Sequence, residues 1–177
     1  NKTGYLELGQ SVTFFVGENG TGKSTLIEAI ALSAGYNAEG GSKNFNFSSR
    51  NTTSNLHNYI TVVKQSYEKD GFFLRAESFY NVASQVDNLG INLSAYGGKS
   101  LHEQSHGESF MSLVQNRFHG NGLYIMDEPE AALSPLRQLT LLSEINRLVE
   151  LDSQFIIATH SPILLAYPNA KIYQITD

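Results

Sequence analysis

Short apolar runs alternate along the chain with segments whose apolar residues recur at helical spacing. The runs are rich in β-branched and aromatic residues and occupy residues 12–16, 72–74, 123–126, 155–157 and 172–175. Their length and composition predict buried strands. Helical spacing is found in residues 26–34, 110–118 and 136–148. Strands that alternate with helices predict an α/β fold, in which helices flank a largely parallel central sheet.

The third predicted helix has the clearest start, because Ser134 can act as its N-cap and Pro135 fits its first turn. Residues 37–58 are crowded with Asn, Ser, Thr and Gly, and residues 87–104 contain a Gly-Gly pair. Both stretches predict loops or small edge elements. No internal repeat or linker is evident, so we expect residues 1–177 to form one domain.

The composition indicates a folded domain of ordinary size. Hydrophobic residues make up 41% of the 177 residues, another 15 residues are glycine, and only 16% of the residues are charged. These proportions exclude a coiled coil and a disordered tail. The absence of cysteine excludes a disulfide framework, a thiolate zinc site and a thiol nucleophile. It is also compatible with a reducing cytosol, and we expect a cytoplasmic protein.

Charge and hydropathy also bear on the partners. The 12 basic and 17 acidic residues give a net charge of −5, which offers no general attraction for nucleic acid or for an anionic membrane. DNA stays open as a partner through a local basic patch. No apolar run approaches the roughly 20 residues of a membrane span, so we expect a soluble chain. Because the first residue is Asn, we expect a piece of a longer protein that lacks its native termini.

A phosphate-binding motif directly follows the first predicted strand. Residues 17–25 read GENGTGKST, a complete match to the Walker A pattern between a strand and a helix. The glycines let backbone N–H groups point inward and the helix adds its positive N-terminal end, which predicts an anion site rather than a plain glycine-rich turn. Lys23 is expected to reach the β- and γ-phosphates of a nucleotide and Ser24 to bind Mg²⁺. The predicted contacts are Gly17, Asn19, Gly20, Thr21, Gly22, Lys23, Ser24 and Thr25.

Two carboxylates follow the third predicted strand. Residues 123–126 run directly into Asp127 and Glu128, which resembles a Walker B motif. A parallel strand that ends in an acid places Asp127 at the edge of the sheet where the phosphate loop lies, and there it can bind magnesium. Glu128 can face the space beyond the γ-phosphate and accept a proton from an attacking water. An isolated Asp-Glu pair would more simply be solvated, but the phosphate loop favours the functional interpretation.

Three further segments resemble the motifs of ABC-type ATPases. Residues 105–109 read SHGES and end 18 residues before Asp127, like the signature motif LSGGQ. Residues 131–134 read AALS, like the D-loop, and residues 158–162 read ATHSP, like the segment of the switch histidine, here His160. The resemblance extends from Val12 to about Ile175. The runs DEPEAALSP and FFLRAESF are most similar to soluble, stand-alone predicted AAA/ABC-like ATPases that are not transporters.

The resemblance implies that two domains pair head to tail and enclose ATP between them. The phosphate loop and Asp127 would act on the nucleotide of their own subunit. Ser105, Gly107 and Glu108 would contact the γ-phosphate held by the other subunit. Glu128 and His160 would be the catalytic residues, and Glu77 is the best counterpart of the Q-loop glutamine, where a carboxylate could bind the magnesium shell.

The sequence departs from the family pattern in several places. His106 and Glu108 stand where small or amide residues are commoner, and Ser134 replaces the usual aspartate of the D-loop. Gln65 is a rival to Glu77 at the Q-loop. The aromatic residue that stacks on adenine is either Tyr5 or part of a missing N-terminal segment.

Two of these segments have a simpler structural interpretation. A lone histidine after a buried strand is commonly a packed or solvated residue. Ser105 followed three residues later by Glu108 matches a capping box at the start of a helix. For the latter segment both interpretations can hold together, because a capped helix start that exposes the Gly107 backbone is itself suited to an anion.

The sequence therefore predicts an ATPase domain that binds ATP and Mg²⁺ and acts as an ATP-dependent homodimer. ATP would close the dimer and hydrolysis would open it. Two alternatives stay open. One is a regulatory module that dimerises on binding nucleotide with negligible turnover, and the other is the ATPase subunit of a membrane transporter, which the unclear Q-loop disfavours.

Overall fold

Five parallel strands form the centre of the computed structural model, which describes residues 4–43, 54–88, 102 and 104–176. The strands are β1 (Val12–Val16), β2 (Asp70–Arg75), β3 (Gly122–Asp127), β4 (Gln154–Ala158) and β5 (Lys171–Gln174). They pair in the order β2-β3-β4-β1-β5, and each neighbouring pair is parallel. The predicted α/β fold with a largely parallel sheet is confirmed.

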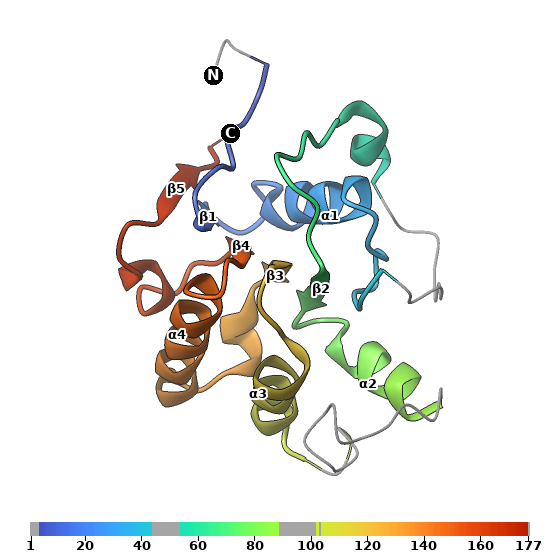
Figure 1. The fold of residues 1–177 in the computed structure, drawn as a ribbon, viewed down its shortest axis with the longest axis vertical. Helices are drawn as coiled ribbons and strands as arrows, with labels where there is room; N and C mark the ends of the chain where they lie inside the picture. The colour runs from blue at the N-terminus through green and yellow to red at the C-terminus, as the bar shows by residue number, and fades with distance from the viewer. Residues whose placement is uncertain (1–3, 44–53, 89–101, 103, 177) are drawn as a thin grey trace.

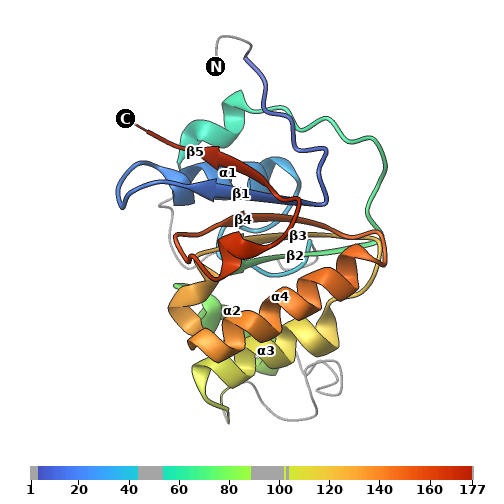
Figure 2. The same ribbon diagram turned by 90° about the vertical axis from the view of Figure 1, so that its left-hand side faces the viewer.

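Helices cover both faces of this sheet, as Figures 1 and 2 show. One face carries α1 (Lys23–Ser33), against which the short 3₁₀ helix η1 (Asn55–Tyr59) packs. The other face carries α2 (Phe79–Asn88), α3 (His106–Arg117) and α4 (Pro135–Val149). Two more 3₁₀ turns are η4 (Pro129–Ala132) and η5 (Leu164–Ala166). Within the described ranges, no helix is both long enough and apolar enough to cross a membrane.

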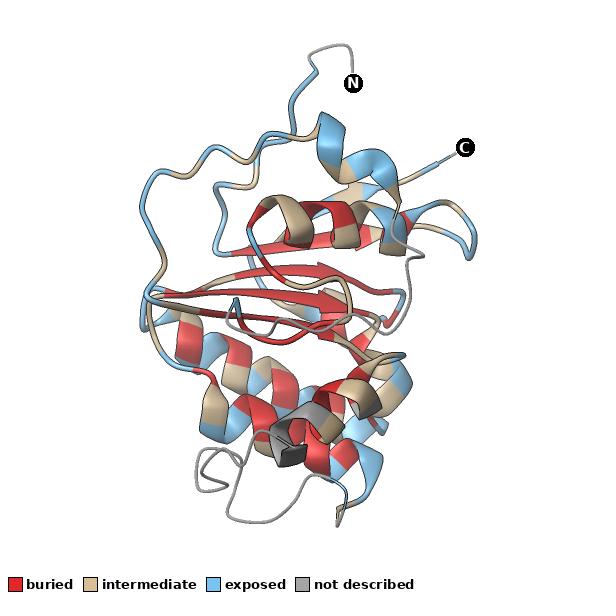
Figure 3. Cartoon of the chain, turned by 90° about the vertical axis from the view of Figure 1, so that its right-hand side faces the viewer, coloured by how far each residue is buried: buried red, intermediate tan, exposed pale blue. Residues whose placement is uncertain are grey.

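Side chains of the strands pack into two separate hydrophobic cores, one on each face of the sheet, because successive side chains of a strand point to opposite faces. In β1, Phe14 packs in the core under α2, α3 and α4, whereas Phe15 packs in the core under α1. In β3, Tyr124 packs in the same core as Phe14, and Ile125 packs in the same core as Phe15. Burial on both faces explains why β1, β2, β3 and β4 read as nearly continuous apolar runs, and Figure 3 shows these strands buried between the two helical layers. The expectation of a buried strand at residues 172–175 is wrong, because β5 lies at the edge of the sheet, where exposed residues alternate with half-buried ones and Ile172 is 50% exposed.

The predicted helix starts are present. Ser134 precedes α4, and its side chain accepts a hydrogen bond from the backbone N–H of Arg137 at 3.5 Å, with Pro135 in the first turn. Ser105 precedes α3 and forms the predicted capping box with Glu108. Both signals are local, since they join residues three apart in the sequence.

Helix α2 was not predicted from the sequence. Phe79, Val82 and Ala83 have helical spacing and are buried against the sheet, but they begin only a few residues after β2. The expected loop at residues 87–104 overlaps the end of this helix and otherwise lies mostly outside the described residues. In the other expected loop, Gly41 forms an isolated antiparallel bridge with Phe73, which makes it a small edge element beside β2.

Candidate functional site

The loop between β1 and α1 is shaped by its glycines. Gly20 and Gly22 both have φ of +88°, a left-handed conformation that favours glycine. At Gly17, a Cβ atom would lie 2.7 Å from the carbonyl oxygen of Ile175 and 2.8 Å from Oγ1 of Thr21. A side chain at position 17 would therefore push the loop away from the segment that follows β5.

Lys23 begins α1 and turns back into this loop. Its side chain is almost buried, with the residue only 4% exposed, and Nζ donates hydrogen bonds to the carbonyl oxygens of Gly17 at 2.7 Å and Glu18 at 2.9 Å. A nearly buried ammonium group at a helix N-terminus makes the loop a strongly positive cradle.

An open pocket of about 290 Å³ lies over the loop. Its lining combines residues of the loop and of α1 with one residue that follows β3, namely Asn19, Gly20, Gly22, Lys23, Ser24, Thr25 and Glu128. The structure thus brings Glu128 together with six of the eight predicted nucleotide contacts. Gly17 and Thr21 support the loop from outside this lining.

Asp127 ends β3 and is buried. Burial raises the pKa of its carboxyl group to about 6, against the opposing influence of the Arg75 guanidinium and the Ser24 hydroxyl. The carboxylates of Glu128 and Glu77 act in the same direction as burial. Oδ1 of Asp127 is buried without a hydrogen-bond partner, so this oxygen is available to a cation.

These residues fit a magnesium ion. Ser24 and Asp127 offer a hydroxyl and a carboxylate oxygen, which are hard ligands. Among the described residues, no three His, Asp or Glu side chains form a metal-binding cluster. The oxygens of Ser24 and Asp127 suit Mg²⁺, which typically takes one or two protein ligands and completes its shell with phosphate oxygens and water.

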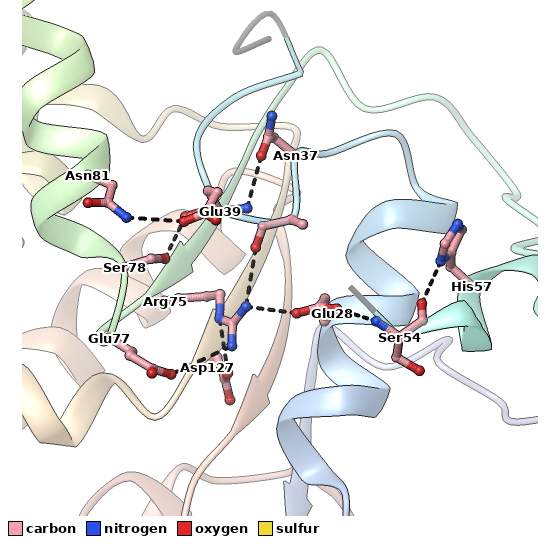
Figure 4. Close-up of polar contacts among 11 residues, drawn as sticks. Glu28, Asn37, Glu39, Ser54, His57, Arg75, Glu77, Ser78, Asn81 and Asp127 are labelled. Atoms are coloured by element: carbon pink, nitrogen blue, oxygen red, sulfur yellow. Dashed lines mark hydrogen bonds and ion pairs between the residues drawn. The ribbon is translucent and has the colours of Figure 1, made fainter. Parts of the chain in front are cut away.

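Arg75, at the end of β2, was not predicted as part of the site. Its guanidinium lies among carboxylates from three parts of the chain, as Figure 4 shows. Nη1 donates to Oε2 of Glu28 on α1 at 2.8 Å, Nε lies 3.5 Å from Oδ2 of Asp127, and Nη2 lies 3.8 Å from Oε2 of Glu77. Arg75 therefore ties the helix of the phosphate loop to the strand that carries Asp127. The sequence signal was a basic residue at the end of an apolar run.

Glu128 has an unusual backbone conformation. Its φ of +48° places a non-glycine residue in the left-handed region, and its N–H donates to the carbonyl oxygen of Ala158 at 2.9 Å. Such a conformation costs energy and persists where the surrounding structure imposes it, commonly at functional sites. Here it turns the chain sharply after β3, and the Glu128 side chain reaches the pocket over the loop.

His160 follows β4 and approaches Glu128 from the neighbouring strand. Its Nδ1 lies 3.8 Å from Oε1 of Glu128 and 3.5 Å from Oε1 of Glu130, while its side chain is 54% exposed. The backbone N–H of His160 also donates to Oε1 of Glu130 at 2.8 Å. The structure thus brings the two predicted catalytic residues side by side.

Glu130 is a second residue of the site that sequence reasoning did not assign. Its side chain is only 8% exposed, and Oε2 is buried without a hydrogen-bond partner. An acid is rarely buried unless it has a partner or a function. Its place three residues after Asp127 was the available signal, but only the fold shows that it holds the backbone of His160.

The start of α3, with Ser105, Gly107 and Glu108, lines no part of the described pocket. Ser105 and Glu108 are exposed, and the hydrogen bond from the Ser105 hydroxyl is the main influence that lowers the pKa of Glu108. The expectation of an exposed Gly107 backbone is wrong for the isolated chain, because Gly107 is buried. A Cβ on it would lie 3.0 Å from the carbonyl oxygen of Ala132, which is too close for a side chain without movement.

The remaining predicted positions lie apart from the pocket. Glu77 follows β2, but its side chain is 90% exposed and forms only a long ion pair with Arg75 among the described residues. Its strand, β2, lies at the edge of the sheet rather than at the centre. Gln65 is exposed and precedes β2, so it lies before the amino end of that strand and away from the loop. Tyr5 is 70% exposed near the start of the chain.

Comparisons with known proteins agree with this geometry. A family model described as an AAA domain matches residues 1–152, and the chain belongs to this family. The ribose import ATP-binding protein RbsA of Bacillus cereus is 26% identical over an alignment of 177 positions, which covers 88% of this chain and 35% of that protein. The chain thus spans about a third of the length of this relative.

The fold is similar to that of the SMC head domain from Thermotoga maritima. The two share 16% sequence identity with a TM-score of 0.52, and the match covers 97% of this chain and 88% of that chain. This similarity shows a shared fold. The family match, the similarity to the ATP-binding protein and the geometry of the loop define the chain as a P-loop, ABC-like ATPase domain.

Proposed function

We propose that this domain binds ATP with Mg²⁺ and hydrolyses it within an ATP-dependent, head-to-tail homodimer. The observation that carries the proposal is the convergence of the phosphate loop, Asp127, Glu128 and His160 at the carboxyl ends of neighbouring strands. This edge of a parallel sheet is where open α/β folds bind ligands.

The groups in and beside the pocket have roles in phosphoryl transfer. The N–H groups of the loop and the Lys23 ammonium hold the phosphates, and Ser24 and Asp127 hold Mg²⁺. When bound, Mg²⁺ neutralises charge that develops on the phosphate oxygens. Glu128 accepts the proton of the attacking water, and His160 donates a hydrogen bond to a γ-phosphate oxygen. Glu77 completes the metal shell only if it leaves Arg75.

The dimer accounts for the start of α3. Ser105, Gly107 and Glu108 lie outside their own pocket, so they serve ATP only if a second subunit presents its nucleotide to them. A twofold, head-to-tail pair satisfies both sites at once. Gly107 is buried in the single chain. The exposed residues beside it, Ser105 and Glu108, would therefore contact the partner's phosphate.

A Glu128→Gln variant tests the proposal. Glutamine keeps the size of the side chain but cannot accept the proton, so steady-state turnover should fall by about 10² or more while ATP binding persists. Glu144→Gln is a matched control, because Glu144 pairs with Arg147 on α4, away from the pocket. Unchanged turnover in Glu128→Gln would place the base elsewhere.

The same variant reports on assembly, because slow hydrolysis prolongs the ATP-bound state. Light scattering with saturating Mg-ATP should show a shift from monomer to dimer. A strictly monomeric species across the micromolar range would exclude the dimer and leave a monomeric nucleotide-binding module.

A regulatory module with little turnover is the second candidate. It is favoured by the departures from the family pattern, since Glu108 caps α3 and Ser134 caps α4 within this chain. The wild-type protein separates the two candidates, because the module would dimerise with ATP but release no phosphate above background.

A further inference from the structure

The guanidinium of Arg137, in the first turn of α4, lies across the start of α3. Nη2 is 3.2 Å from Oε1 of Glu108, and Nη1 donates to Oγ of Ser105 at 3.4 Å. A Cβ atom on Gly107 would be only 2.5 Å from Nη1. Arg137 thus lies against Ser105, Gly107 and Glu108, the three residues that would face the partner's phosphate in the proposed dimer.

Both carboxylate oxygens of Glu108 are engaged within its own chain. Oε2 accepts hydrogen bonds from the backbone N–H of Ser105 at 3.0 Å and from its hydroxyl at 2.6 Å. Oε1 faces Arg137. The interactions with Ser105 and Arg137 favour the ionised form of Glu108, and they lower its pKa.

An ionised acid at this position conflicts with the proposed dimer. Head-to-tail pairing brings the negatively charged triphosphate of one subunit to the start of α3 in the other. A carboxylate there would repel it, whereas an amide would not. The charge of Glu108 must therefore be balanced if the two surfaces are to meet.

We propose that Arg137 is the residue that balances this charge and holds Ser105 and Glu108 in place, so that the start of α3 can accept the partner's triphosphate. This role rests on the proposed dimer. It makes Arg137 a positioning residue rather than a catalytic one, because its guanidinium contacts Ser105 and Glu108.

The position of Arg137 also links this surface to the catalytic edge. The segment η4 begins directly after Glu128 and leads through Ser134 into α4. Gly107 packs closely against Ala132 of η4. Both Gly107 and Arg137 therefore adjoin the segment that follows Glu128.

A single variant and a double variant in the slow Glu128→Gln background test the role of Arg137. Light scattering over a protein dilution series with saturating Mg-ATP gives the dissociation constant of the dimer. Arg137→Gln should weaken the dimer at least tenfold, because it leaves the charge of Glu108 unbalanced. Glu108→Gln with Arg137→Gln should recover most of that loss, because the acid that needed balancing is gone.

The control is Arg147→Gln, which removes another partly exposed ion pair of the same helix, Arg147 to Glu144 at 2.8 Å. It should leave the dimer unchanged. Calorimetric ATP titrations of dilute protein and thermal unfolding of each variant show whether ATP affinity or folding has changed. Both ion pairs are exposed, so little stability is expected to be lost at either one.

The outcomes separate this role from the dimer itself. A parent protein that stays monomeric with ATP overturns the dimer and the role of Arg137 with it. A parent that dimerises, with an Arg137→Gln variant that dimerises equally well, overturns the role of Arg137 alone. A double variant as weak as Arg137→Gln shows that charge balance is not what Arg137 provides.

Discussion

The phosphate loop and the start of α3 both place glycine at the beginning of a helix, but they present different surfaces. The loop surrounds an open pocket, its lysine is nearly buried, and Asp127 beside it has a buried oxygen without a hydrogen-bond partner. At the start of α3, Ser105 and Glu108 satisfy each other and Arg137 covers Gly107.

The difference teaches how a site can be divided between two chains. Polar groups that are held in place without partners form a receptor within one chain, since such groups are costly unless a ligand uses them. A helix start that is already capped gains little from a ligand by itself. Its contribution depends on what a second surface brings to it.

The largest expected effect lies in the loop. Lys23→Ala should weaken ATP binding by about 10²-fold or more, because it removes charge-assisted hydrogen bonds to two phosphates. Calorimetry on the folded variant measures this loss. Lys171→Ala is the control, since Lys171 pairs with Glu7 outside the pocket. An unchanged ATP affinity in Lys23→Ala would mean that the phosphate loop is no more a nucleotide receptor than the start of α3.

Asp127 should make stability depend on pH. Its pKa is raised from 3.8 to about 6 in the folded chain, so between these values the folded state binds more protons than the unfolded state. The free energy of unfolding therefore falls as pH rises through this window, and the cost is complete above about pH 6. Asp127→Asn removes this cost. It should stabilise the nucleotide-free protein by about 3 kcal/mol at pH 8 and by well under 1 kcal/mol at pH 4, since each pKa unit corresponds to about 1.4 kcal/mol.

Urea unfolding of Asp127→Asn and of the wild type at both pH values checks this prediction. An Asp70→Asn variant is a useful comparison, because Asp70 pairs with Arg117 at the other end of the sheet. A gain in stability at pH 4 as large as that at pH 8 would show that ionisation of Asp127 is not the cause.

Glu130 offers a test of how the catalytic edge is supported. Glu130→Ala removes the acceptor of the His160 N–H bond and should lower turnover about tenfold with little change in ATP affinity. Glu130→Gln should restore most of the activity, because an amide oxygen accepts the same bond. Steady-state kinetics and calorimetry separate the two effects. Equal losses in both variants would mean that the charge of Glu130 matters more than its hydrogen bond.

The smallest effect is expected at the capping box. Ser105→Ala should lower the free energy of unfolding by about 1 kcal/mol, because it removes the N-cap of α3. ATP affinity of the monomer should not change, since Ser105 lies outside the pocket. Urea unfolding and calorimetry measure both quantities. A loss of monomer affinity would place the start of α3 within its own nucleotide site.

The sequence by itself determined the local features of this protein. Apolar runs marked all five strands, and β1 has the bounds that were predicted. Ser105 and Ser134 marked the starts of α3 and α4. These signals depend on residues a few positions apart, so backbone geometry and capping chemistry are sufficient to read them.

Only the tertiary structure decided which distant groups meet. The strand order places β1 between β4 and β5, which local patterns do not specify. Arg75 meets Glu28 and Asp127 across 47 and 52 positions of the sequence, and Glu130 meets His160 across 30. These contacts follow from the packing of parallel strands whose carboxyl ends share one edge. Local sequence patterns do not predict this packing, because the packing arises only when the buried faces of separate elements come together.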